Sequence, residues 1–168
     1  MKKLLILLAI FIFASHTNAQ NSNFSVLPTV GITKPLIDAG VGIHVGVNPS
    51  YKLVNWFAIE GQVSYIYTNI FSTFLSGYKG SFKAGNFLAG GRLYLNPNAK
   101  NTLFYLNLLA GLKILKEVSN GIARETEYGL GASLGGFVEY RRITLGLTFD
   151  SPQNSILKLG YAFNNRTK

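Results

Sequence analysis

A stretch of two-residue alternation near the C-terminal end limits what this chain can fold into. Over 128–140 and again over 143–149, apolar residues occupy every second position, with Ala132 and Gly136 as the small ones. Mostly Gly, Ser, Thr or Glu stands between them, with Phe137 as the large apolar exception. Because successive side chains of a β-strand point to opposite faces, the pattern predicts a hairpin with one apolar face and one small or polar face. Arg141-Arg142 breaks the alternation and marks the tight turn between the two strands.

The same period recurs about eight times from Phe24 onwards, which predicts an all-β fold of eight antiparallel strands. We expect strands over about 24–33, 41–53, 56–68, 81–95, 102–115, 128–140, 143–149 and 155–163. The fourth is the least regular, so we expect a β-bulge near Gly85. Long connections are expected over 34–40, 69–80 and 116–125, and tight turns at Val54-Asn55 and Arg141-Arg142. Long connections at one end and short ones at the other are typical of an up-and-down barrel, here a single domain.

Residues 1–19 are predicted to be a cleavable signal peptide that precedes a barrel domain over 20–168. Two lysines come before an unbroken apolar run over 4–14, and the small residues Thr17 and Ala19 stand before a cut after Ala19. Those eleven apolar residues are too few for a membrane-spanning helix, which needs about 20. The domain is therefore expected to be exported.

Cysteine is absent, which excludes disulfides, a cysteine metal site and a lipid-anchored lipoprotein. The formal net charge is +9, but the positive residues are scattered with no basic block interleaved with aromatics. This distribution argues against nucleic acid as a partner.

Two kinds of barrel fit eight meandering strands. A soluble, lipocalin-like barrel turns its apolar face inward, whereas an outer-membrane barrel turns it outward towards lipid. In this sequence the polar face carries little charge and many small residues, as the narrow interior of an eight-stranded barrel requires. The apolar face has no charged residue in the middle of any expected strand. Both features favour the outer-membrane barrel.

Aromatic residues of the apolar face gather at the strand ends and aliphatic ones at the centres, which predicts two aromatic girdles at the membrane interfaces. The girdle at the short-turn end is expected to contain Tyr51, Trp56, Phe57, Phe104, Tyr140, Tyr161 and Phe163. The girdle at the long-loop end is expected to contain Tyr65, Tyr67, Tyr128 and Phe149.

The chain from 20 to 168 resembles the small outer-membrane β-barrel domain family (PorT-like) and, more loosely, the eight-stranded OmpA/OmpX-type barrels. The resemblance rests on the signal peptide, the YGLGASLGGFVEYRRITLGLTFD hairpin and the closing LKLGYAF. It implies a final strand ending in an aromatic residue that the outer-membrane assembly machinery reads, and Phe163 is the matching residue. Five residues follow Phe163, and its glycine lies three positions before it where the signal has five, so the match is partial.

Glu60 and Arg92 are both expected inside the barrel, at similar depths on neighbouring strands, where a buried charge needs a partner. We predict a Glu60–Arg92 ion pair within an interior polar network that also draws on Lys158, Glu139 and His44. One interpretation is a plug that fills the barrel, and the other is a gate or polar path. His44 is the one histidine left after signal cleavage, and Gly46 stands where a barrel deacylase would need serine. A hydrogen-bonded interior histidine is therefore expected, with no catalytic, metal or cofactor site.

These patterns predict a non-enzymatic outer-membrane barrel with a structural, adhesive or accessory role. Two alternatives remain, a narrow porin-like pore for small solutes and a secreted soluble barrel that binds an apolar ligand. The expected partners are outer-membrane lipids and the barrel assembly machinery, with the connections over 69–80 and 116–125 as the contact surface for a further partner. The protein is expected to be a monomer.

Overall fold

The computed structural model describes residues 23–36, 39–71, 79–119, 122–151 and 154–164. The predicted signal peptide lies outside these residues. Within the described ranges, no helix is long and apolar enough to cross a membrane.

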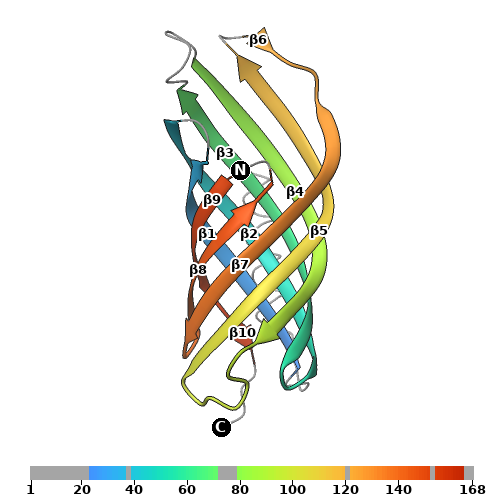
Figure 1. Cartoon of the computed structure of the whole chain (residues 1–168), viewed down its shortest axis with the longest axis vertical. Helices are drawn as coiled ribbons and strands as arrows, with labels where there is room; N and C mark the ends of the chain where they lie inside the picture. Colours follow the sequence, from blue (N-terminus) through green and yellow to red (C-terminus); the bar gives the residue numbers. More distant parts are fainter. Residues whose placement is uncertain (1–22, 37–38, 72–78, 120–121, 152–153, 165–168) are drawn as a thin grey trace, which may run out of the picture.

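Eight long strands form one antiparallel meander, and two additional strands have only two residues each (Figure 1). The long strands are β1 (Phe24–Pro35), β2 (Ala39–Val54), β3 (Phe57–Phe71), β4 (Lys79–Tyr94), β5 (Thr102–Ser119), β7 (Glu127–Tyr140), β8 (Ile143–Asp150) and β9 (Asn154–Tyr161). The short strands are β6 (Ile122–Ala123), which pairs with β5, and β10 (Phe163–Asn164), which continues the line of β9.

The sheet closes on itself through its first and last long strands. β1 pairs with β9 from Thr29↔Gly160 to Pro35↔Asn154, and β10 extends the seam at Val26↔Phe163. Every neighbouring pair of long strands is antiparallel, and closure pairs both edges of the sheet over the body of the barrel. The predicted eight-stranded up-and-down barrel is confirmed.

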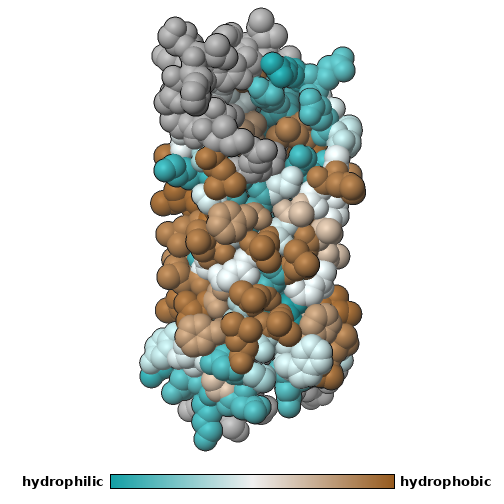
Figure 2. Space-filling view, in the orientation of Figure 1, coloured by the Kyte–Doolittle hydropathy of each residue, from teal (hydrophilic) through white to brown (hydrophobic). Residues whose placement is uncertain are grey.

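The barrel is apolar outside and mostly polar in the middle of its interior. Val45, Val63, Leu108 and Leu134 all point outward and are half or more exposed, whereas Glu60, Arg92 and Lys158 are about 1% exposed inside. Figure 2 shows apolar side chains as a broad band across the middle of the face in view, above a polar lower end. A soluble protein rarely exposes so large an apolar surface to water, whereas a barrel in a bilayer needs an apolar band facing the lipid. The structure is that of a membrane-spanning barrel, and a soluble barrel with an apolar inside is ruled out.

Two expectations about the strands were wrong. β4 keeps a continuous register with both neighbours through Gly85, and the irregularity lies instead between Lys52 and Val54, beside the turn that joins β2 to β3. The described parts of the connections expected over 34–40, 69–80 and 116–125 are largely strand, because β1 to β5 are longer than the apolar pattern indicates. Residues 72–78 and 120–121 of these connections lie outside the described residues.

The strands differ in how far they extend at the long-loop end. β5 has 18 residues, whereas β8 and β9 have 8 each. In Figure 1 β3, β4 and β5 rise well above the upper ends of β8 and β9. One side of the barrel therefore carries a wall formed by β3, β4 and β5, which continues beyond the apolar band.

Candidate functional site: the barrel interior

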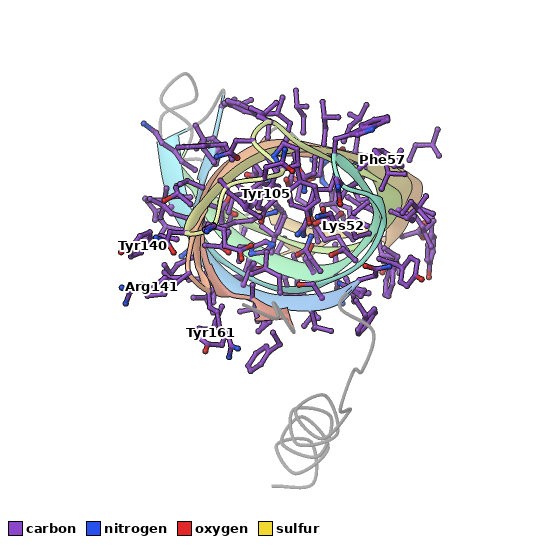
Figure 3. The ribbon with its side chains drawn as sticks, turned by 90° about the horizontal axis from the view of Figure 1, so that it is seen from below. Lys52, Phe57, Tyr105, Tyr140, Arg141 and Tyr161 are labelled. Carbon is purple, nitrogen blue, oxygen red and sulfur yellow. The ribbon has the colours of Figure 1, made fainter. Side chains whose placement is uncertain are left out.

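A row of side chains crosses the interior at the short-turn end. The Lys52 ammonium lies 5.4 Å from the centre of the Tyr94 ring, and the Tyr94 and Tyr105 ring centres are 5.8 Å apart. Tyr105 stacks on Phe137 at 4.9 Å with an interplanar angle of 9°. These four residues come from β2, β4, β5 and β7, so the row reaches from one wall to the other. Seen from below, Tyr105 lies within the ring of strands, while Tyr140 and Tyr161 project outside it (Figure 3).

Glycines make the space that Phe137 occupies. A Cβ added to Gly146 would collide with the Phe137 ring, and one added to Gly135 would lie 2.8 Å from its Cε2 atom. Gly146 is directly opposite Phe137 in the β7–β8 register. Phe137, the one large residue among the small inward residues of β7, therefore fits because its partner on β8, Gly146, has no side chain.

The Glu60 carboxylate holds together one half of the interior polar network. Arg92 Nε donates to Glu60 Oε2 at 2.7 Å, and Asn48 Nδ2 donates to Oε1 at 2.7 Å. Asn107 Nδ2 approaches the same Oε1 at 3.4 Å, and the Arg92 guanidinium lies 4.3 Å from the centre of the Tyr105 ring. The structure thus brings Glu60 and Arg92 into contact as the sequence predicts.

The Asp150 carboxylate holds together the other half. Lys158 Nζ lies 3.1 Å from Asp150 Oδ2, Ser133 Oγ donates to Oδ1 at 2.6 Å, and Gln62 Nε2 donates to Oδ2 at 3.2 Å. Gln62 Oε1 also accepts from Lys158 Nζ and from Asn48 Nδ2, each at 3.4 Å. Gln62 and Asn48 therefore join the two ion pairs into one network with members on seven of the eight long strands. Lys158 enters it through Asp150 and Gln62 and makes no direct contact with Arg92.

The remaining predicted members of the network lie at its margins. Glu139 is about 2% exposed on β7, opposite Thr144 of β8. His44 is about 1% exposed on β2, but neither ring nitrogen has a hydrogen-bond partner among the described residues, contrary to expectation. Sequence reasoning missed Asp150, Gln62 and Asn48. Their inward positions in the alternation were visible, but nothing in the alternation shows which inward side chains meet.

Large apolar side chains fill the interior nearer the long-loop end, which corrects the expectation of a polar or small interior throughout. Ile66, Phe82, Ala84 and Ile156 form one buried cluster, and Leu115 packs against it. Other apolar side chains buried in the barrel are Leu27, Leu88, Leu103 and Leu109. Among the described residues, the network thus lies between the row from Lys52 to Phe137 and the apolar cluster around Ile66.

The interior contacts described above join strands to one another, and two arrangements typical of catalytic sites can be checked against them. Among the described residues, no three histidine or carboxylate side chains gather as metal ligands. Asp150 and Ser133 are in contact, but His44 does not hydrogen-bond to either of them, so the described residues do not assemble a serine–histidine–acid arrangement.

A groove of about 390 Å³ lies on the outer surface, around Gly136. Leu106, Val138, Leu145 and Leu147 line it from neighbouring strands, and all four point outward. It belongs to the surface that faces lipid.

The predicted girdle residues lie on the outer face. Tyr51, Trp56, Tyr65, Phe104, Tyr128, Tyr140, Phe149 and Tyr161 are more than 40% exposed, and Phe57, Tyr67 and Phe163 are half-buried. Phe57 lies across Gly91 of the neighbouring strand, where an added Cβ would come within 2.7 Å of its ring. Phe163 pairs with Val26 across the closing seam, and its ring centre lies 5.0 Å from that of Tyr161. That these residues lie at the two membrane interfaces stays a prediction.

No family model matches the sequence, and no curated protein matches it. The PorT-like resemblance therefore stays a prediction.

Solved structures of other barrels do match the fold. Neisserial surface protein A (NspA) is 10% identical with a TM-score of 0.56, covering 86% of this chain and 97% of that one. The N-terminal β-barrel domain of Pseudomonas aeruginosa OprF is 12% identical with a TM-score of 0.52, covering 84% and 97%. The outer membrane protein OprG from Pseudomonas aeruginosa is 10% identical with a TM-score of 0.50, covering 84% and 96%. At such identities the likeness concerns the fold alone.

Proposed function

The fold is that of an eight-stranded outer-membrane β-barrel, and we propose that the chain has a non-enzymatic structural, adhesive or accessory role in that membrane. Its barrel serves as a sealed anchor, and the wall formed by β3, β4 and β5 is the part offered to partners at the cell surface. Outer-membrane lipids and the barrel assembly machinery are its constant partners. Phe163, at the end of the closing strand, is the residue that the machinery reads.

The observation that carries this proposal is the filling of the interior. The row from Lys52 to Phe137 crosses the barrel. The Glu60–Arg92 and Asp150–Lys158 pairs each join neighbouring strands, and Gln62 links the two pairs across the interior through its hydrogen bonds with Asp150 and Lys158. A solute path through eight strands would have to run between these side chains, and a barrel of this size leaves room for little else. The same filling favours a plug over the gate or pore interpretation.

Single-channel recording in planar bilayers tests the sealed interior. The purified wild-type barrel is expected to insert without producing conductance steps. Insertion is checked independently, by protection of the barrel from added protease. Regular steps of fixed amplitude from wild-type protein would contradict the proposal and assign the chain to the narrow-pore class.

A further inference from the structure

Two lysines lie side by side on the outer face of the wall. Lys83 of β4 and Lys116 of β5 are direct partners in the β4–β5 register, and both are exposed. Tyr67 of β3 is the partner of Lys83 on the other side, and the Lys83 ammonium lies 6.0 Å from the centre of its ring. Tyr67 is held in place in turn, because its hydroxyl donates to Asn69 Oδ1 at 2.9 Å.

Like charges directly opposite each other destabilise a sheet, so this pair is unfavourable unless something negative lies between the ammonium groups. Among the described residues, neither lysine forms an ion pair with a carboxylate. Glu117 follows Lys116, but its side chain pairs with Arg124 at 3.3 Å. The connecting segments 72–78 and 120–121 contain no Asp or Glu in their sequence. Glu125 and Glu127 are exposed beside this part of β5, but neither forms an ion pair with Lys83 or Lys116. The described chain near this pair thus supplies no carboxylate in ion-pair contact with it.

The position of Lys83 and Lys116 along the barrel axis indicates what supplies their negative counter-charge. On β5 the outward positions from Phe104 to Ile114 are all apolar, and Lys116 is the next outward residue. Ten residue steps at about 3.3 Å, on a strand tilted by about 40°, span a height of about 25 Å, which is the thickness of the apolar band of an outer-membrane barrel. Lys116 therefore stands at the level where the acyl chains end and the lipid headgroups begin, and Lys83 stands beside it.

We propose that Lys83 and Lys116, with Tyr67 beside them, bind the phosphate of an anionic lipid in the leaflet at the long-loop end. The two ammonium groups contact the phosphate oxygens, and the acyl chains descend along Ile114 and Leu112 of β5. A phosphorylated lipid fits better than a soluble anion, because the lysines face the membrane side of the wall at the edge of the apolar band. This inference depends on the membrane-spanning fold and not on the role proposed above.

The test is a titration of the detergent-solubilised full barrel with dioleoyl phosphatidic acid, followed by native mass spectrometry. Lys83→Gln and Lys116→Gln are each expected to raise the dissociation constant about fivefold, and the double variant about 30-fold, since a lysine near an anionic lipid surface contributes about this much. Lys34→Gln is the matched control. Lys34 is also an exposed lysine near the long-loop end, but its cross-strand partner is Ser155. It should leave the dissociation constant unchanged.

Two further measurements distinguish a loss of lipid binding from a loss of barrel stability, and lipid binding from binding of free phosphate. In neutral detergent without added lipid, the double variant is expected to unfold at or above the wild-type temperature, because relief of the like-charge contact offsets the lost contact of Lys83 with the Tyr67 ring. Phosphatidic acid should then stabilise the wild type and not the double variant, and phosphatidylcholine or equimolar inorganic phosphate should stabilise neither. Equal lipid affinity in the double variant, equal loss in Lys34→Gln, or displacement of the lipid by equimolar inorganic phosphate would each overturn the proposal.

Discussion

Glu60 is the carboxylate that gathers one half of the interior network. Its carboxylate is about 1% exposed and receives donors from Asn48, Arg92 and Asn107, which belong to three other strands. A buried carboxylate is tolerated when its charge is paired and its oxygens are hydrogen-bonded. Removing the Arg92 side chain leaves the Glu60 carboxylate buried without a counter-charge, which lowers the free energy of unfolding of the barrel.

Arg92→Ala should lower the unfolding free energy by about 3 kcal/mol or more, since breaking a buried ion pair from one side has that cost. The measurement is a urea titration in detergent micelles, followed by tryptophan fluorescence. The double variant Glu60→Gln with Arg92→Met should recover much of the loss, because neither charge remains. Arg142→Ala, at an exposed turn position, is the control. An unchanged midpoint for Arg92→Ala would show that the pair does not stabilise the barrel.

Gly146 gives a second prediction at this scale. A methyl group on Gly146 would enter the Phe137 ring, so Gly146→Ala is expected to destabilise the barrel by about 1–3 kcal/mol. Adding Phe137→Leu to the same chain should relieve part of that loss. Gly61→Ala is the control, because the nearest atom to its added Cβ is 3.6 Å away. Equal losses from Gly146→Ala and Gly61→Ala would disprove the packing role given to Gly146.

Among the elements, the turn between β7 and β8 contains a strained residue. Arg141 has φ of 59°, the one positive value among the described non-glycine residues, and its guanidinium lies 5.4 Å from the Tyr140 ring centre. A left-handed conformation costs roughly 1 kcal/mol in a residue with a Cβ, and glycine avoids that cost.

Arg141→Gly should therefore raise the unfolding midpoint, or leave it unchanged if the lost contact with Tyr140 offsets the relief. Arg142→Gly is the matched control, since Arg142 does not have positive φ and glycine there adds only chain freedom. Urea titration of the two variants should place Arg141→Gly above Arg142→Gly. The reverse order would contradict the described turn.

Alternation predicted the number of strands, their order and the face of nearly every residue, because a strand has only two sides. It did not predict where β3, β4 and β5 end, since pairing continues above the membrane after the apolar repeat has stopped. Depth counted along neighbouring strands was enough to predict the Glu60–Arg92 contact. The Asp150–Lys158 contact joins the hairpin strands β8 and β9 at an offset of four positions, because Lys158 is opposite Gly146 and Asp150 is opposite Asn154. Alternation shows which side chains face inward but not that one of them reaches across such an offset.

For the whole molecule, the central feature is the inversion of polarity. Apolar residues face outward over a band about as tall as a bilayer, and the charged residues of the mid-strands face inward. In that environment the barrel needs no apolar core of the usual kind. Packing, ion pairs and hydrogen bonds across the interior hold the walls together, and the wall formed by β3, β4 and β5 extends into the surroundings from this anchor.

Spin labelling along β7 tests this inversion most directly, and the natural absence of cysteine allows single labels without a background. Cysteines placed one at a time over residues 130–138 would carry nitroxides in barrels reconstituted into lipid bilayers. Labels replacing Leu130, Leu134 and Val138 should collide readily with oxygen, which dissolves in lipid, and rarely with a water-soluble nickel chelate. Labels replacing Ser133 and Phe137 should be shielded from both. Nickel access at the even positions equal to that of a free label in water would contradict the membrane-spanning barrel.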